Sequence, residues 1–86
     1  MYRIRFLRKA ANELKKIDPI WQKRIKEKIN KLAENPRILK NRIRLLKGKQ
    51  KTLFRLKVGK YRIIFQKKEE ELIIIIVRVA HRREVY

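Results

Sequence analysis

Residues 52–66, TLFRLKVGKYRIIFQ, decide the fold that this sequence predicts. Apolar residues alternate with charged or polar residues on both sides of Gly59-Lys60, which is typical of two strands that each bury one face. A two-residue connection with glycine first favours a type II′ turn, because glycine tolerates a positive φ. The stretch therefore predicts an antiparallel hairpin with strands at residues 52–58 and 61–66.

The same alternation predicts which side chains share a face of this hairpin. If Tyr61, Ile63 and Phe65 meet the helices, Arg62 projects onto the opposite face. Arg55 and Lys57 then lie beside it on the neighbouring strand. Like charges held this close cost stability unless an anion lies between them. We interpret this face as a candidate phosphate cradle. The alternative is an ordinary solvated face of an amphipathic sheet.

Further strands are expected on either side of the hairpin. Residues 72–79, LIIIIVRV, are apolar at successive positions, which is typical of a strand buried on both faces, and they are expected to form the most buried strand. Residues 67–71, KKEEE, are expected to form the loop before it. Residues 43–46, IRLL, are expected to form an edge strand, and residues 37–42 a linker.

The N-terminal part changes from a strand pattern to a helical pattern. Residues 2–6, YRIRF, alternate as in a short strand, and residues 7–17 then place their apolar side chains on one helical stripe. Asp18 ends this helix and caps a second one, whose first position suits Pro19. The second helix ends before Pro36. The short connection between the helices predicts an antiparallel helical hairpin.

Together these elements predict a single α+β domain over residues 1–86. Its order is β-α-α-β-β-β-β, with the N-terminal helical hairpin packed on one face of a mainly antiparallel sheet. A chain of this length buries only about 60% of its unfolded surface, so the core is expected to be small.

Charge is the strongest signal in the composition. Twenty-seven Lys and Arg face eight Asp and Glu, a formal net charge of +19, and no acidic residue lies between Glu34 and Glu69. Such an excess repels itself and favours a polyanionic partner, either nucleic acid or an acidic protein. A charged solubilising surface is the alternative, although such surfaces usually mix both signs.

Composition also excludes several classes of site. The chain has no Cys and one His, which excludes disulfides, thiolate metal sites and a His-rich metal site within one chain. The absence of Cys fits a reducing cytoplasm. The longest apolar run, residues 72–77, is too short to cross a membrane, and no secretory signal is expected. No clustered carboxylates suggest a magnesium site, so we expect no metal and no cofactor.

The C-terminal residues 79–86, VAHRREVY, gather groups suited to RNA cleavage. Imidazole has an ordinary pKa near neutrality, so His81 is a candidate for proton transfer. Tyr86 can stack on a base or use its hydroxyl in proton transfer. RNA can be cut without metal because its 2′-hydroxyl attacks the neighbouring phosphate, and arginines such as Arg62 and Arg82 suit the charge on the phosphorane. An inert surface His and a Tyr that only docks the terminus are the alternatives.

These features together resemble one known family. GKYRIIFQ at residues 59–66, the buried strand after it, VAHRREVY at residues 79–86 and LKG at residues 46–48 are similar to RelE toxins of the RelE/ParE superfamily. The resemblance covers essentially the whole chain. It implies a ribosome-dependent endoribonuclease that cleaves mRNA in the ribosomal A site and leaves a 2′,3′-cyclic phosphate. It also implies a cognate RelB-like antitoxin, expected to be acidic, as a partner beside rRNA and mRNA.

The resemblance assigns roles to single residues. Arg62 matches the family arginine after the Gly-x-Tyr turn, which stabilises charge at the scissile phosphate, and Arg82 matches a tail arginine with an acid or charge-stabilising role. Tyr86 matches the tail tyrosine that stacks on the substrate base and has been proposed as a base. His81 takes a position often filled by Lys, and relatives with a tail histidine use it in catalysis. The residues expected to bind RNA are Arg55, in the place of a family lysine, and Lys57, Lys47, Lys49, Lys51 and Arg83.

Besides His81, the chain departs from the family pattern in a strand and in the tail. Leu53 stands where better-known members carry another strand lysine, and the tail is shorter between its arginine and the final Glu-Val-Tyr. The lysines at 47, 49 and 51 are the candidates to replace the missing charge.

Two other functions stay open. ParE-type members share the fold but act on DNA gyrase and lack the nuclease tail. A noncatalytic RNA-binding or ribosome-associated protein would show the same charge. Arg62, Arg82 and Tyr86 favour the nuclease.

Overall fold

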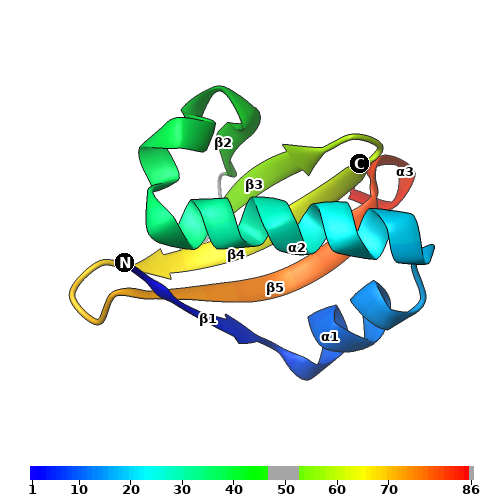
Figure 1. Ribbon diagram of the computed structural model, residues 1–86, viewed down its shortest axis with the longest axis horizontal. Coiled ribbons are helices and arrows are strands. Elements are labelled where there is room, and N and C mark those ends of the chain that lie inside the picture. The colour runs from blue at the N-terminus through cyan, green and yellow to red at the C-terminus, as the bar shows by residue number, and fades with distance from the viewer. Residues whose placement is uncertain (47–52, 86) are drawn as a thin grey trace.

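Strands and helices follow one another in the predicted order in a computed structural model of the protein, which describes residues 1–46 and 53–85 (Figure 1). The elements are β1 (Arg3–Phe6), α1 (Arg8–Lys15), α2 (Pro19–Glu34), the 3-10 helix η1 (Pro36–Arg42), β2 (Ile43–Leu46), β3 (Leu53–Val58), β4 (Tyr61–Lys68), β5 (Ile73–His81) and α3 (Arg82–Val85). Two of these, η1 and α3, are short helical segments that periodicity alone did not predict.

The strands form one five-stranded sheet in the order β1-β5-β4-β3-β2. Neighbouring strands are antiparallel except for β1 and β5, which run parallel. The chain therefore returns from the C-terminal hairpin to place β5 between β4 and the N-terminal strand. The predicted α+β fold with a mainly antiparallel sheet is confirmed.

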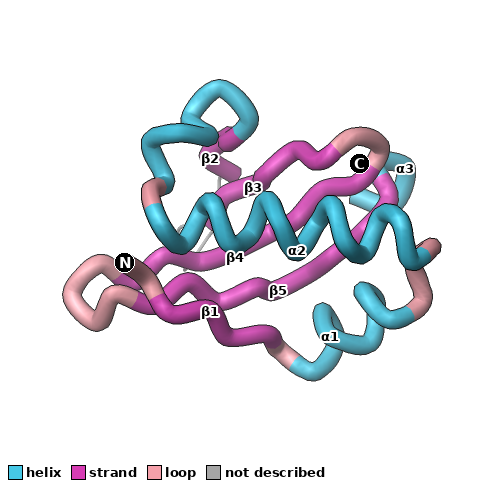
Figure 2. Tube along the Cα trace, in the orientation of Figure 1, coloured by secondary structure: helices cyan, strands magenta, loops and turns pink. Residues whose placement is uncertain are grey.

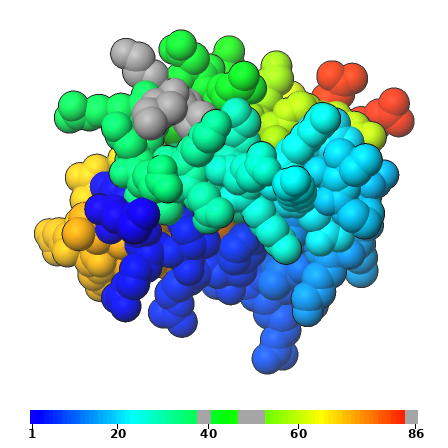
Figure 3. All heavy atoms as spheres, in the orientation of Figure 1, coloured from blue at the N-terminus to red at the C-terminus, as the bar shows by residue number. Residues whose placement is uncertain are grey.

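Helix α2 crosses one face of the sheet, and α1 lies beside β5 beyond the end of β1, with Ala10 and Leu14 in the same core (Figure 2). The space-filling view of that face shows the two helices, blue to cyan, over the strands, with C-terminal residues emerging at one corner (Figure 3). The core between the layers contains Ala10, Leu14, Ile25, Ile29, Leu32, Leu56, Val58, Ile63, Phe65, Ile74, Ile76 and Val79. Since a buried Leu or Ile side chain contributes about 1.5–3 kcal/mol, this layer is the main source of stability.

The helix boundaries follow local chemistry. The Asp18 carboxylate caps α2 by accepting a hydrogen bond from the backbone N–H of Ile20 at 3.2 Å, with proline in the first turn, as predicted. Helix α1 ends at Lys15, two residues before its predicted end, and Gln22 Nε2 donates to the carbonyl of Ile17 at 2.6 Å. This bond closes the connection between the helices. None of the helices in the described ranges is both long and apolar enough to pass through a membrane.

Other predicted boundaries also differ from those of the structure. Residues 37–42, expected as a linker, lie within η1. Strand β4 continues into the expected loop because Lys67 and Lys68 pair with β5, and β5 continues to His81 because that residue pairs with Tyr61. Hydrogen bonding between strands extends both elements beyond the stretch that the apolar pattern marks.

Strand β5 is buried more completely on one face than on the other. Ile74 and Ile76 are fully buried beneath the helices, whereas Ile73 and Ile75 on the opposite face are only half-buried. The predicted burial on both faces is therefore met only in part, because among the described residues α1 and α2 cover a single face of the sheet (Figure 2).

Candidate active site on the open sheet face

The sheet face opposite α1 and α2, which we call the open face, carries a cluster of cations. The strand register places Lys57 directly opposite Arg62 and places Arg55 opposite Arg44 of the edge strand β2. These side chains line a groove of ≈ 330 Å³, which we call the cationic groove. The lining residues described are Asn41, Arg42, Arg44, Arg55, Lys57 and Arg62, none of which is a carboxylate.

Arg62 lies at the base of the cationic groove and is held in place by backbone carbonyls. Its side chain emerges from β4, yet the residue is only 7% exposed. Its Nη1 donates to the carbonyl oxygen of Gly59 at 2.9 Å and to that of Tyr61 at 3.0 Å. Burial, followed by the positive charges of Arg55 and Arg82, holds the pKa of Arg62 below its ordinary value. These neighbours disfavour the cation, so an anion bound here would relieve the repulsion.

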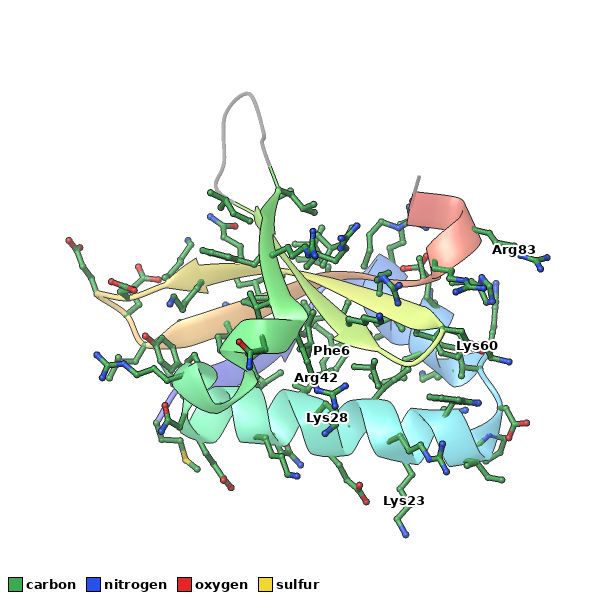
Figure 4. The ribbon with its side chains drawn as sticks, turned by 90° about the horizontal axis from the view of Figure 1, so that it is seen from above. Phe6, Lys23, Lys28, Arg42, Lys60 and Arg83 are labelled. Carbon is green, nitrogen blue, oxygen red and sulfur yellow. The ribbon has the colours of Figure 1, made fainter. Side chains whose placement is uncertain are left out.

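The C-terminal segment reaches the same end of the sheet. The backbone N–H of Arg82 donates to the carbonyl of Lys60 at 2.9 Å, so α3 begins against the β3–β4 turn. The views agree that α3 lies beside this turn, on the side of the sheet away from α2 (Figures 2 and 4). The structure therefore brings Arg62 and Arg82 together, and the effect of Arg82 on the pKa of Arg62 reflects that proximity.

His81 lies on the helix side of the sheet, away from Arg62. It pairs with Tyr61 across the ladder, and the two rings meet edge-on with centroids 5.8 Å apart. Because successive strand residues point to opposite faces, the side chain of Arg62 and that of His81 emerge on different sides. His81 lines a second depression, of ≈ 520 Å³, that also contains Glu13 and Asp18. Its Nδ1 accepts a hydrogen bond from the backbone N–H of Arg83 at 3.2 Å.

The other predicted site residues are partly outside the described ranges. Lys47, Lys49, Lys51 and Tyr86 fall on residues that the structure does not describe. The side chain of Arg83 is exposed and projects away from the sheet (Figure 4).

A carboxylate on α1 holds the end of β5 that leads into the tail. Glu13 Oε2 lies 2.8 Å from Arg78 Nη2, and Glu13 Oε1 accepts a hydrogen bond from the backbone N–H of Val79 at 3.0 Å. Strand β1 has already ended at Phe6, so this carboxylate takes the place of a neighbouring strand. Burial raises the pKa of Glu13, but its bonds to Arg78 and Val79 and the charges of Arg78 and Lys9 outweigh that effect, so the net direction is downward.

Sequence reasoning missed part of the cationic groove. Arg44 lies directly opposite Arg55 in the paired strands, so the two side chains share a face of the sheet. The alternation within residues 43–46 could have predicted this if that segment had been paired with β3. Arg42 and Asn41 come from η1 and carry no periodic signal. Across residues 1–46 and 53–85, no three His, Asp or Glu side chains are grouped so that they could hold a metal ion.

Comparison with known proteins identifies the family. The family model for the ParE toxin of type II toxin–antitoxin systems, parDE, matches residues 4–86. An Escherichia coli protein described as RelE-like is 31% identical over 81 residues, covering 94% of this chain and 83% of that protein. Both matches extend over nearly the whole chain.

Solved structures show the same fold. RelE in the RelE–RelB complex of Pyrococcus horikoshii has a TM-score of 0.80 at 22% identity, covering 94% of each chain. The RelB–RelE complex of Methanococcus jannaschii contains a match with a TM-score of 0.73 at 29% identity, covering 95% of this chain and 94% of that one. Isolated Escherichia coli RelE has a TM-score of 0.75 at 24% identity, covering 94% of this chain and 84% of that one. The family inferred from the hairpin and the C-terminal residues is therefore confirmed, and the chain belongs to the RelE/ParE family of type II toxin–antitoxin toxins.

Proposed function

We propose that this toxin is a ribosome-dependent endoribonuclease that cleaves mRNA in the ribosomal A site. The observation that carries the proposal is the position of Arg62. Its guanidinium is held by two backbone carbonyls at the base of the cationic groove, close enough to Arg55 and Arg82 for their charges to lower its pKa. A fixed guanidinium with two further arginines near it is suited to a phosphodiester.

The reaction uses the nucleophile that RNA itself carries. The 2′-hydroxyl oxygen forms a bond to the adjacent phosphorus as the bond from phosphorus to the 5′-oxygen breaks, which leaves a 2′,3′-cyclic phosphate and a 5′-hydroxyl. One proton leaves the 2′-hydroxyl and one reaches the departing oxygen. Arg62 and Arg82 stabilise the charge on the phosphorane, and groups that are already fixed do so without reorganisation. No metal-activated water is needed for this attack.

Tyr86 and His81 are the two proposed groups for proton transfer. Tyr86 is also proposed to stack on the substrate base, as aromatic side chains do with unstacked RNA. His81 keeps Nε2 for such a role, because Nδ1 already accepts the N–H of Arg83. Since the imidazole lies on the helix side, RNA would have to pass round the end of β5 to meet it. Tyr86→Phe and His81→Ala, compared under single-turnover conditions, separate the two assignments.

The cationic groove is proposed to guide RNA toward Arg62. Arg42 and Arg44 extend the charge of Arg55 and Lys57 toward the edge strand β2. Lys47, Lys49, Lys51 and Arg83 are proposed to add phosphate contacts on the ribosome. Solved relatives are found with RelB, and we propose an acidic RelB-like antitoxin that covers the same cations in the cytoplasm, where ribosomes are found.

The test adds purified protein to translating ribosomes and maps the mRNA ends. Arg62→Ala is expected to lower the cleavage rate by about 10²–10³-fold, as loss of a fixed charge-stabilising donor does elsewhere. Lys23→Ala is the control, because Lys23 is an exposed cation on the outer side of α2 (Figure 4). Cleavage that is unchanged in Arg62→Ala, or lost only in proportion to folded protein, would contradict the proposal.

Inhibition of DNA gyrase is the second candidate, because the matching family model is that of ParE toxins. Intact mRNA together with blocked supercoiling would favour this function. Ribosome binding with neither effect would instead indicate a noncatalytic protein.

A further inference from the structure

We propose that Trp21 of α2 is a positioning residue for Arg62 and Arg82, because it seats the β3–β4 turn that holds both arginines. The inference rests on the proposed function for its catalytic consequence. Its structural part, the control of Arg62 by Trp21, can be tested in the free protein.

The two arginines share one anchor although Arg62 belongs to strand β4 and Arg82 to helix α3. The carbonyl of Gly59 accepts the Nη1–H of Arg62 at 2.9 Å, and the carbonyl of the next residue, Lys60, accepts the backbone N–H of Arg82 at 2.9 Å. A shift of this two-residue turn would therefore move the guanidinium of Arg62 and the backbone from which the Arg82 side chain projects. Their separation depends on the position of the turn as well as on the strands.

Trp21 lies directly against this turn. Gly59 has φ +57°, and a Cβ built on it would overlap with Cη2 and Cζ3 of the Trp21 indole. Glycine is thus needed here for two reasons, the left-handed backbone and the contact with the ring. The close approach means that the indole sets how near the turn comes to α2.

The indole is itself held by a series of ring contacts. Its centroid lies 5.6 Å from that of Tyr61, and Arg24 Cζ lies 4.9 Å from it. Lys60 Nζ lies 5.9 Å from the centroid of the Trp21 ring. Figure 4 shows Lys60 at the tip of the β3–β4 turn. Tyr61 continues the series to His81, with centroids 5.8 Å apart. Contacts therefore run from α2 through the turn residues to the last residue of β5.

The attachment of α2 to the sheet does not depend on Trp21 alone. Ile25, Ile29 and Leu32 of the same helix are almost fully buried in the core, whereas Trp21 is half-buried at the end of that stripe. Replacing the indole by a smaller side chain is therefore expected to loosen the turn while the helix stays docked. This separates a positioning role from a general packing role.

The activity test compares Trp21→Leu, Trp21→Phe and a control, Ile29→Val, a conservative change in the core part of α2. Single-turnover cleavage at saturating programmed ribosomes should fall by about 10–100-fold in Trp21→Leu, because small misplacement of reacting groups costs this much. Ribosome affinity should be unchanged, since no cation is removed. Trp21→Phe should restore most of the rate, and Ile29→Val should cleave at the wild-type rate per folded molecule. Equal losses in Trp21→Leu and Ile29→Val would overturn the inference.

A second measurement does not depend on cleavage. Because two carbonyls hold Nη1 of Arg62, its guanidinium protons should give distinct NMR signals in the free protein, and these should average in Trp21→Leu but not in Ile29→Val. Unchanged Arg62 signals in Trp21→Leu would overturn the inference even if the wild-type protein cleaves mRNA. Loss of those signals in a protein that does not cleave would support the seating of the turn and reject the proposed nuclease.

Discussion

Arg62 and Arg78 are both largely shielded from solvent, but different kinds of groups contact their guanidiniums. Arg78 forms an ion pair with Glu13, and that carboxylate also caps a strand N–H. Arg62 forms no ion pair with a carboxylate in the described ranges, bonds to neutral carbonyls and has Arg55 and Arg82 as neighbours. The first arrangement is neutralised within the protein, whereas the second leaves an arginine beside two further cations.

A single substitution at Arg62 should show whether this side chain binds an anion. Arg62→Met removes the charge and keeps much of the volume, so relief of repulsion should offset the lost hydrogen bonds, and the unfolding free energy should change by no more than about 1 kcal/mol. A short RNA oligonucleotide should raise the melting temperature of the wild type more than that of Arg62→Met, because binding stabilises the folded state. Equal stabilisation of both proteins would place the anion elsewhere.

Glu13 predicts a pH dependence of stability. Its pKa in the folded protein lies below the ordinary value of 4.5, so its contribution is present above that pH and is lost as the pH falls through the folded pKa. Glu13→Gln should lower the unfolding free energy at pH 7 by about 1.5–3 kcal/mol, and the difference should shrink under acid conditions. Urea denaturation at several pH values measures it. Glu27→Gln, an exposed change on α2, is the control, and a difference that persists at low pH would contradict the assignment.

At the scale of elements, the β3–β4 turn joins the two layers as well as the two strands. Trp21 reaches it from α2, and the turn carbonyls reach Arg62 and Arg82 on the other side. A hairpin turn is usually a mobile surface feature. Here packing from the helix layer gives it a defined position, which the proposed chemistry requires.

Gly59→Ala tests the turn as a unit. The new methyl group meets the Trp21 ring and the residue keeps φ +57°, so the unfolding free energy should fall by about 1–3 kcal/mol. In the Trp21→Leu background, the loss of unfolding free energy caused by the clash with the ring should disappear, and the loss caused by the positive φ should remain. A double-mutant cycle should therefore give a coupling energy of at least about 0.5 kcal/mol. Glu70→Ala, an exposed change in the turn between β4 and β5, is the control. Additive changes in unfolding free energy would mean that the Trp21 ring and the turn are not energetically coupled.

At the scale of the whole molecule, the net charge of +19 acts in two directions. It opposes folding of the free protein through self-repulsion, and it favours binding to polyanions such as nucleic acid through release of counterions. The sheet concentrates part of this charge in the cationic groove, on the face that α1 and α2 leave open.

Salt should therefore stabilise the free protein and weaken its complexes. Raising sodium chloride from about 50 to 500 mM should raise the melting temperature, because screening reduces repulsion among exposed charges. Over the same range ribosome affinity should fall steeply, with a log–log slope that decreases when Arg55 or Lys57 is replaced by Ala. Affinity that does not change with salt would exclude phosphate contacts as the main source of binding.

Local pattern alone determined much of this protein. The alternation in residues 52–66 predicted the hairpin, its turn and the shared face of Arg55, Lys57 and Arg62, because side-chain direction in a strand depends only on the parity of the position. The capping chemistry at Asp18 likewise predicted the start of α2 from adjacent residues.

Only the tertiary structure decided the features that join distant parts of the chain. It brought Arg42 and Arg44 into the cationic groove and turned His81 to the helix side. It also held the Arg62 guanidinium with the carbonyls of Gly59 and Tyr61, next to the turn that Trp21 contacts. Periodicity reports which residues share a face of one element. It does not report which face of another element they meet, because that depends on pairing and packing between residues far apart in the sequence.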